Sequence, residues 1–445
     1  MPARDVKPIA VDFGRPLPPI RALHGTNFGP LYTQGRDLSD YFRAAGFPSL
    51  RLHDCALVCK DTVDIKDLFP LAHLDESEPT NWTFGPTDDY LQTAKALDTQ
   101  AIYRLGPSIE HQHPKYFVHP PSDYDKWARI CCQIIRHYNE GWADGFHHDI
   151  AYWEIWNEPW HPSMWTGTQE QWFALYETAS KAIKRSFPHL KLGGADASGE
   201  YAESFLAYCQ QHECPMDFFC WHLYARTPKQ VVESTREAKQ RLENYGFGDA
   251  ELNLNEWNWF PEEDWSWRTS ASRRRRFFDQ LASAESAAFI VATLSYLQDE
   301  PMTMTNWYAP FLGRWGMFDT DARPQKPFYA FVAFNEMLQT PQRAATNGDK
   351  LDTGLSVLAG TDDAGCHARV LVSNFADVAV SGVRLTLKNL PGGTWHASQR
   401  LLDDALDLQP AESAVFTHDF AHISFALPPG SVRLIDLRRT ESEPR

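Results

Sequence analysis

The sequence contains no apolar run of about 18 residues, the length that a membrane-crossing helix needs. Its start, MPARDVKPIAVDF, also lacks the apolar core of a signal peptide. Basic residues are fewer than acidic ones, 42 against 58, and the formal net charge of −16 disfavours binding to nucleic acid or to an anionic membrane surface. These absences predict a cytoplasmic protein with neither a membrane nor a nucleic-acid partner.

Cofactor and metal motifs are also lacking. The eight cysteines form no C-x-x-C pair and several lie in apolar runs, so we expect reduced, buried thiols typical of a reducing compartment. No G-x-G-x-x-G or Walker pattern occurs, and the sequence predicts no cofactor. The stretch GPSIEHQHPKYFVH carries Glu110, His111, His113 and His119, but their spacing fits no metal-ligand template. It favours a sugar-contacting loop over a metal site.

Aromatic residues are abundant, at 13% of the chain with 16 tryptophans, and apolar residues reach 43%. This composition predicts a large folded core and argues against disorder. Aromatic rings form flat stacking platforms in sugar-binding clefts, but the cores of large barrels bury them too. Composition alone leaves both uses open.

Short apolar or β-branched runs alternate with longer amphipathic runs over residues 22–338. Strands are expected at 21–27, 49–54, 100–106, 151–158, 190–195, 217–224, 251–258 and 304–308. Helices are expected at 37–46, 86–98, 122–142, 168–187, 199–213, 227–246, 273–299 and 326–338. Strict alternation of this kind predicts an α/β fold, a (β/α)₈ TIM barrel over residues 22–340.

After about residue 340 the helical periodicity disappears. The segments 369–375, 381–390, 393–402, 422–430 and 431–439 alternate like half-buried strands between Gly, Pro and Asp turns. They predict a C-terminal all-β sandwich domain over residues 341–445. The strand-like stretch PIAVDFGRPLPP, within residues 1–21, is expected to join this sandwich as an edge strand.

Two predicted barrel strands end in glutamates. AYWEIWNE, the fourth strand, ends at Glu158, and ELNLNEWN, the seventh, ends near Glu256. Barrel enzymes carry their chemistry at the C-terminal ends of the strands, so the two acids are expected to face each other across the mouth. A protonated and an ionised carboxyl group so placed suit glycosidic bond cleavage. The alternative is that each glutamate forms a salt bridge with a barrel arginine.

The motifs WEIWNEP and LNEWN resemble those of the clan of retaining glycoside hydrolases that places its acid/base after strand four and its nucleophile after strand seven. Within that clan the chain is most similar to glycoside hydrolase family 39, the β-xylosidases and α-L-iduronidases. RLHD, WHLY and WGMFDTDARPQKPFYAFVAFNEM are further matches, and the resemblance covers nearly the whole chain. It implies retention through a covalent glycosyl–enzyme intermediate, with carboxyl groups about 5–5.5 Å apart.

The resemblance implies that Glu158 is the general acid/base and Glu256 the nucleophile, with Asn157 bonded to the sugar 2-OH. Arg51 should lie beneath Glu256 and keep it ionised, because a nearby cation lowers the pKa of a carboxyl group. Strand alternation should place Trp156 on the same side as Glu158. Further substrate contacts are expected from His53, Asp54, His111, Trp165, His222, Tyr224, Trp257 and Trp307.

Some residues depart from the family pattern. Xylosidases of the family carry R-x-H-G on strand two, whereas this chain reads Arg51-Leu52-His53-Asp54. Asp54 either binds sugar hydroxyls or caps the next loop. The nucleophile segment NEWNWF replaces the usual T-E-[YF]-N. These departures leave the sugar open.

The sequence therefore predicts a retaining, β-xylosidase-like glycoside hydrolase that trims β-linked sugars from short oligosaccharides or other glycosides. One alternative is a hydrolase of the same family directed at a sugar other than xylose or at an exopolysaccharide. Another is a carbohydrate-binding protein that has lost turnover, and a third is a scaffold built on the sandwich. A homo-oligomer assembled through the sandwich is open as well.

Overall fold

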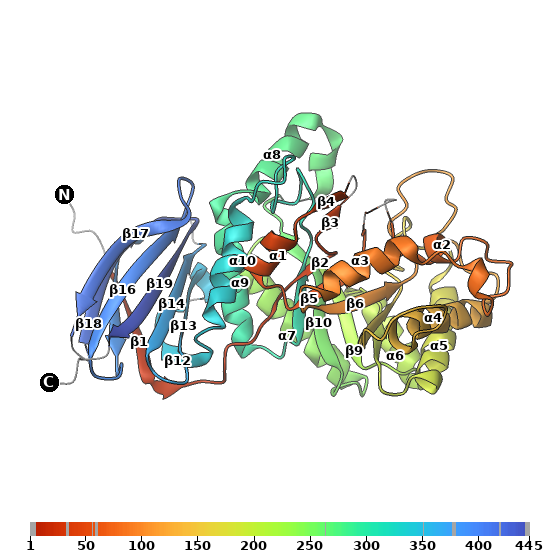
Figure 1. Cartoon of the computed structure of the whole chain (residues 1–445), viewed down its shortest axis with the longest axis horizontal. Coiled ribbons are helices and arrows are strands. Elements are labelled where there is room, and N and C mark those ends of the chain that lie inside the picture. Colours follow the sequence, from red (N-terminus) through yellow and green to blue (C-terminus); the bar gives the residue numbers. More distant parts are fainter. Residues whose placement is uncertain are drawn as a thin grey trace.

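The computed structural model describes residues 6–32, 35–55, 57, 61–262, 264–349, 351–375, 380–417 and 420–440. Figure 1 shows a barrel with its surrounding helices beside a separate sheet domain, with α9 (Ala284–Tyr296) and α10 (Lys326–Met337) between the two. The predicted TIM barrel with a C-terminal β-sandwich is confirmed.

A closed barrel of parallel strands forms the larger domain. Its strands, in chain order, are β2 (His24–Asn27), β5 (Ser49–Leu52), β6 (Gln100–Leu105), β7 (Tyr152–Ile155), β8 (Lys191–Gly194), β9 (Phe218–Ala225), β10 (Glu251–Trp259) and β11 (Met304–Trp307). Pairing of β11 with β2 closes the ring. β2, β5, β7 and β11 are buried along their whole length, as expected for a parallel sheet covered by helices.

Helices surround the barrel strands, and some of them begin at a side-chain cap. They include α1 (Ser39–Ala45), α3 (Gly85–Lys95), α4 (Tyr124–Glu140), α5 (Gln169–Ser186), α6 (Gly199–Gln211) and α7 (Pro228–Asn244). Asp123 caps α4, and Thr168 and Thr227 form capping boxes with the third residue of α5 and of α7. Each such cap satisfies backbone N–H groups that have no partner inside the helix. Smaller elements are α2 (Ile65–Leu68), β3 (Leu31–Tyr32) and β4 (Arg36–Asp37).

The helix expected over 273–299 is two helices instead, α8 (Ala271–Leu281) and α9. The break lies at Ser283, whose side chain accepts a hydrogen bond from the N–H of Ser286 and so starts α9. A short polar side chain that bonds to the backbone competes with continuation of a helix. In Figure 1, α8 projects from the body of the molecule.

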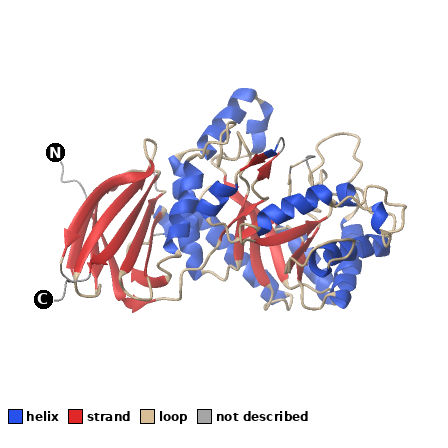
Figure 2. Cartoon of the chain, in the orientation of Figure 1, coloured by secondary structure: helices blue, strands red, loops and turns tan. Residues whose placement is uncertain are grey.

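The sandwich is a nine-stranded sheet around its own apolar core. Its strands are β1 (Val6–Pro16), β12 (Gln342–Thr346), β13 (Leu355–Thr361), β14 (His367–Asn374), β15 (Val380–Lys388), β16 (Thr394–Leu402), β17 (Asp407–Phe416), β18 (Phe420–Leu427) and β19 (Ser431–Thr440). β1 lies inside the sheet, antiparallel to β12 and parallel to β15, and not at the edge where it was expected. Figure 2 shows that this domain is mostly strand.

Polar contacts join the sandwich to the barrel helices. The Ser373 hydroxyl donates to the Ala288 carbonyl at 2.8 Å, and the Tyr296 hydroxyl donates to the Leu355 carbonyl at 2.6 Å. Arg400 forms an ion pair with Glu336 of α10. α9 is buried from Ala284 to Ser295 nearly all round, as expected for a helix covered on both sides.

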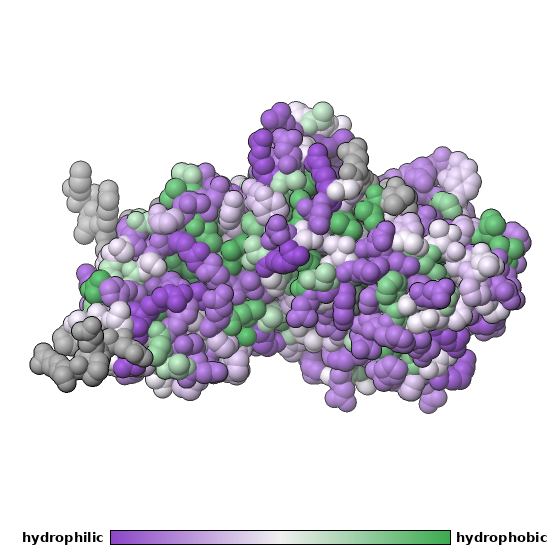
Figure 3. Space-filling model, in the orientation of Figure 1, coloured by the Kyte–Doolittle hydropathy of each residue, from purple (hydrophilic) through white to green (hydrophobic). Residues whose placement is uncertain are grey.

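One face of the surface is largely hydrophilic, and most of the described cysteines are buried. The face in Figure 3 is largely hydrophilic, with small, separate apolar patches. None of the described helices combines the length and the apolarity that crossing a membrane requires. Among the described cysteines, Cys366 is an exposed free thiol, and the buried free thiols are Cys55, Cys131, Cys132, Cys209, Cys214 and Cys220.

Candidate active site

Glu158 lies in a turn beyond its strand and not at the strand's end. β7 stops at Ile155, and both Trp156 and Glu158 have left-handed backbone, with φ of 69° and 41°. Because side chains alternate only within a strand, the expected shared side of Trp156 and Glu158 is wrong. Trp156 instead packs edge-on against Trp165, with ring centroids 5.1 Å apart, and donates to the Met164 carbonyl.

Glu158 and Glu256 lie close together, with His222 between them. One carboxylate oxygen of each glutamate and one ring nitrogen of His222 all lie within 4.8 Å of one another. Nδ1 of His222 is 2.8 Å from Oε1 of Glu158 and 3.6 Å from Oε2 of Glu256. The side chains of Glu158 and Glu256 are 15% and 7% exposed, so the pair is reachable but largely withdrawn from water.

Glu256 is held by Tyr224 and Arg51. The Tyr224 hydroxyl donates to Oε1, and Nη1 of Arg51 lies 3.3 Å from Oε2. Burial raises the pKa of Glu256 to about 7, although His222, Arg51 and the Tyr224 hydrogen bond each act to lower it. Arg51 thus contacts Glu256 as expected, but the net direction of the pKa shift is opposite to the one predicted.

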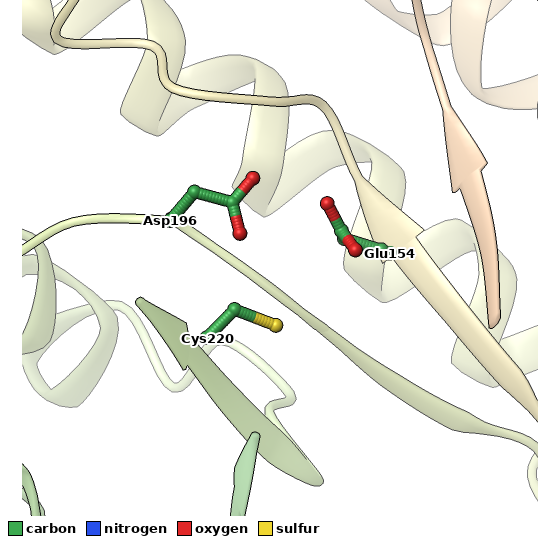
Figure 4. Close-up of side chains that lie close together, drawn as sticks. All are labelled: Glu154, Asp196 and Cys220. Carbon is green, nitrogen blue, oxygen red and sulfur yellow. The ribbon is translucent and has the colours of Figure 1, made fainter. Parts of the chain in front are cut away.

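Burial and the nearby Glu158 outweigh these contacts. Arg51 is also shared among several partners. Its guanidinium donates to both oxygens of Glu154, with Nε 2.8 Å from Oε2, and to Oδ1 of Asn157 at 2.6 Å. Oδ2 of Asp196 lies 3.2 Å away. Figure 4 shows the side chains of Glu154, Asp196 and Cys220 pointing into one space inside the barrel. Arg51 therefore neutralises a buried acidic cluster as much as it serves Glu256.

The charges of this cluster shift one another's pKa values. Burial raises the pKa of Glu154 to about 7. Burial would also raise the pKa of Asp196, but His222 and Arg51 beside it hold that pKa well below its usual range. Burial alone would lower the pKa of His222, whereas Glu256 and Asp196 raise it well above its usual range. Alternating charges thus run from Arg51 through Asp196 to His222 and the two glutamates.

Two trios in the described part of the chain bring donor atoms close enough for a cation: Glu158 with His222 and Glu256, and Glu154 with Asp196 and Cys220. The second trio already has a positive charge, because the Arg51 guanidinium contacts both of its carboxylates. Burial raises the pKa of the Cys220 thiol well above its usual range, which favours the neutral form. The donor set fits an arginine-centred network better than a metal centre.

Asp54 and His53 lie on the same rim, after β5. Asp54 is 6% exposed, has a left-handed φ of 54° and accepts a hydrogen bond from the Tyr308 hydroxyl at 2.8 Å. Nε2 of the buried His53 is 3.7 Å from the same carboxylate oxygen. The Tyr308 ring in turn meets the ring of Tyr224, so these groups continue the wall that holds Glu256.

Several predicted sugar contacts lie elsewhere. Trp257 and Trp307 are fully buried and pack edge-on against each other, beside Phe289 of α9 and Phe331 of α10. The strand that aims Glu256 into the barrel aims its neighbour Trp257 outward, so the prediction that these two rings contact sugar is wrong. Trp165 is only 4% exposed, and His111 is exposed on the loop between β6 and α4.

The network also contains residues that the motifs did not reveal: Glu154, Asp196, Asn255, Asn27 and Tyr308. The Asn255 side chain donates to Glu154 and to Asp196, at 2.9 Å each, and Arg51 donates to Asn27. Glu154 could have been found from the sequence, because it lies on the strand that leads to Glu158. An acid that faces the barrel interior needs a buried cation such as Arg51. No sequence pattern pointed to Asp196, which lies in a loop after β8.

A family model and two curated proteins match parts of this chain. The family model "Glycosyl hydrolases family 39" matches residues 107–370, more than half of the chain. The chain is 26% identical over 256 residues to a β-xylosidase of Geobacillus stearothermophilus, covering 49% of this chain and 48% of that protein. It is 26% identical over 247 residues to a β-xylosidase of Caldicellulosiruptor saccharolyticus, covering 51% and 49%. The matches thus span about half the length of these curated relatives.

Solved structures share the whole fold. A glucosidase from Croceicoccus marinus superposes with a TM-score of 0.84 at 24% identity, covering 98% of this chain and all of that one. A monomeric β-xylosidase from Caulobacter crescentus superposes with a TM-score of 0.74 at 15% identity and the same coverage. At 24% and 15% identity, these similarities are evidence for the fold only. The family match over residues 107–370, from after β6 into the start of the sandwich, shows that the chain belongs to glycoside hydrolase family 39.

Proposed function

We propose that this glycoside hydrolase cleaves β-linked glycosides with retention, with Glu256 as nucleophile and Glu158 as general acid/base. The observation that carries the proposal is the pair of carboxylate oxygens within 4.8 Å of each other. Retaining enzymes hold their carboxyl groups about 5–5.5 Å apart, whereas inverting enzymes need about 6.5–9.5 Å to admit a water molecule. The close approach of these oxygens favours direct attack by Glu256 and hence retention.

In the first step, Glu256 attacks the anomeric carbon while Glu158 donates a proton to the leaving oxygen. The C–O bond to the leaving group breaks and an ester bond to Glu256 forms. In the second step, Glu158 takes a proton from water, and the resulting hydroxide displaces Glu256 from the anomeric carbon. Tyr224 and Arg51 position the attacking carboxylate through their contacts with its two oxygens.

We extend the proposal to removal of terminal sugars from short oligosaccharides. The small exposure of both glutamates suits a terminal ring that enters end-on better than a polymer that lies across a groove. The two relatives named β-xylosidases support a xylosidase-like substrate. In this reading Asn157, fixed by Arg51, is the partner of the sugar 2-OH.

The test uses activated aryl β-glycosides. Glu256→Ala should abolish turnover, and Glu158→Ala should be rescued by azide, with a β-glycosyl azide as product. Glu251→Gln is a matched control, because Glu251 begins the strand that carries Glu256 and pairs with Lys191 at the far end of the barrel. Wild-type rates in either glutamate variant, or an inverted product seen by NMR, would refute the assignment.

A further inference from the structure

Asp196 is a buried carboxylate that takes no direct part in the proposed double displacement. It follows β8, is 1% exposed and has a left-handed φ of 46°. A non-glycine residue in this conformation carries a conformational cost, so the surrounding contacts must hold it there. Such strain is common where a side chain must be held in one particular place.

The contacts of Asp196 connect it to the groups around Glu158. Its Oδ1 accepts a hydrogen bond from the Asn255 amide at 2.9 Å and lies 3.5 Å from Nε2 of His222. Its backbone carbonyl accepts the indole N–H of Trp160 at 2.8 Å, on the loop that carries Glu158. The imidazole is therefore flanked by carboxylates, with Asp196 at Nε2 and Glu158 at Nδ1.

This placement decides which ring nitrogen carries hydrogen. A bare lone pair on Nε2 would face the carboxylate of Asp196 and be repelled, whereas an N–H would be attracted. The other charged group near the ring is Glu256, 3.6 Å from Nδ1, and Arg51 lies behind Asp196. With hydrogen fixed on Nε2, the second ring nitrogen is left to share one proton with Glu158.

We propose that Asp196 is a positioning residue for proton transfer, which keeps hydrogen on Nε2 of His222 so that Nδ1 and Glu158 share the proton delivered to the leaving group. The inference rests on the proposed double displacement and deepens it. The shared proton leaves with the departing oxygen in the first step, and the attacking water returns one proton to Glu158 in the second. The raised pKa of His222 agrees with this assignment.

Asp196→Asn tests the proposal, because it removes the charge and keeps the size and the backbone carbonyl. Acid assistance matters most when the leaving group is poor, so kcat/KM on a phenyl glycoside should fall about tenfold or more. On a 2,4-dinitrophenyl glycoside, which leaves without a proton, it should fall less than about threefold. The alkaline limb of the pH profile should also move down by about 1–3 pH units, since an opposite charge at this range supports the proton on His222 by that amount.

If Asp196 had a purely structural role, Asp196→Asn would lower kcat/KM equally on both glycosides and leave the alkaline limb of the pH profile in place. That result would overturn the proposal. Asp196→Asn added to His222→Asn should cause no further loss, because the two changes act on one step. Asp217→Asn is the control: Asp217 pairs with Lys184 just before β9, at the opposite end of the barrel, and its loss should leave the leaving-group dependence unchanged.

A second measurement keeps the inference testable if Asp196→Asn fails to fold. ¹⁵N NMR of histidine-labelled wild-type protein, with the His222 signals assigned by their loss in His222→Asn, reports the hydrogen on each ring nitrogen. We expect Nε2 to stay protonated through pH 8. A bare Nε2 at neutral pH would refute the inference. If wild-type protein hydrolyses no glycoside, the proposed function fails, while this spectrum still shows whether Nε2 of His222 carries hydrogen.

Discussion

Replacement of Arg51 by methionine should destabilise the barrel more than any surface charge change. Arg51 is fully buried, and its guanidinium contacts two carboxylates that are themselves buried, Glu154 and Asp196. Removing one partner of a buried ion pair costs about 3–5 kcal/mol, because the remaining charge has no compensation. Since two acids lose their cation together, we expect the upper part of that range at pH 8.

The cost should depend on pH in a defined direction. The pKa of Glu154 is about 7 with Arg51 in place, and removal of the cation would raise it further. Between pH 7 and 8 the folded variant then retains a proton that folded wild type has released, so the variant loses stability faster as pH rises. One proton over one pH unit corresponds to about 1.4 kcal/mol, so the cost at pH 8 should exceed that at pH 6 by about this amount.

Urea unfolding followed by tryptophan fluorescence at pH 6 and pH 8 measures both effects. Arg323→Met is the matched control, because the Arg323 side chain is 76% exposed and its pairs with Asp319 and Asp321 are loose, at 3.9 and 3.5 Å. That change should cost less than about 1 kcal/mol. Adding Glu154→Gln to Arg51→Met should recover part of the loss. If Arg51→Met behaves like Arg323→Met at both pH values, the reasoning about buried charge is wrong.

Three further outcomes follow from the geometry. Tyr224→Phe removes a hydrogen bond that lowers the pKa of Glu256, so the acid limb of kcat/KM should move to higher pH; an unmoved limb contradicts this. Trp257→Ala should cost about 3–5 kcal/mol of unfolding free energy, while Trp257→Phe should leave KM within about twofold; a tenfold rise in KM would restore the sugar-platform reading. Gly25→Ala should lower the free energy of unfolding in urea by about 1–3 kcal/mol, because a Cβ there would meet a side-chain oxygen of β5 at 2.1 Å. Gly85→Ala is the control and should cost nothing, because the space around Gly85 is open. Equal effects of the two changes would argue against tight packing at β2.

The barrel could be predicted from sequence because its signals are local. Alternating apolar runs and capping residues such as Thr168 and Thr227 mark where strands and helices begin. Features that depend on competition were harder to predict. Ser283 breaks the long helix because its side chain bonds to the backbone, and the place of β1 inside the sheet depends on partners near the other end of the chain.

The candidate site was predictable where a motif named the residue and uncertain where packing decided it. Glu158 and Glu256 follow from WEIWNEP and LNEWN, and they meet in space. Trp257 and Trp307 lie beside site residues in sequence, but strand alternation turns them into the helix layer. Asp196 stands in a loop whose backbone conformation no local pattern encodes, and only the fold brings it to His222.

The place of β1 has a consequence for how the protein is made. This strand emerges from the ribosome before the barrel, but its two neighbours, β12 and β15, are synthesised more than 300 residues later. The barrel is thus, in connectivity, an insertion between the first and second strands of the sandwich. If the barrel has already folded when β12 appears, it brings β1 and β12 near each other. It thereby removes most of the entropy cost of closing so long a loop between them. Nascent chains stopped before β15 should therefore hold a finished barrel beside a first strand that still waits for its neighbours.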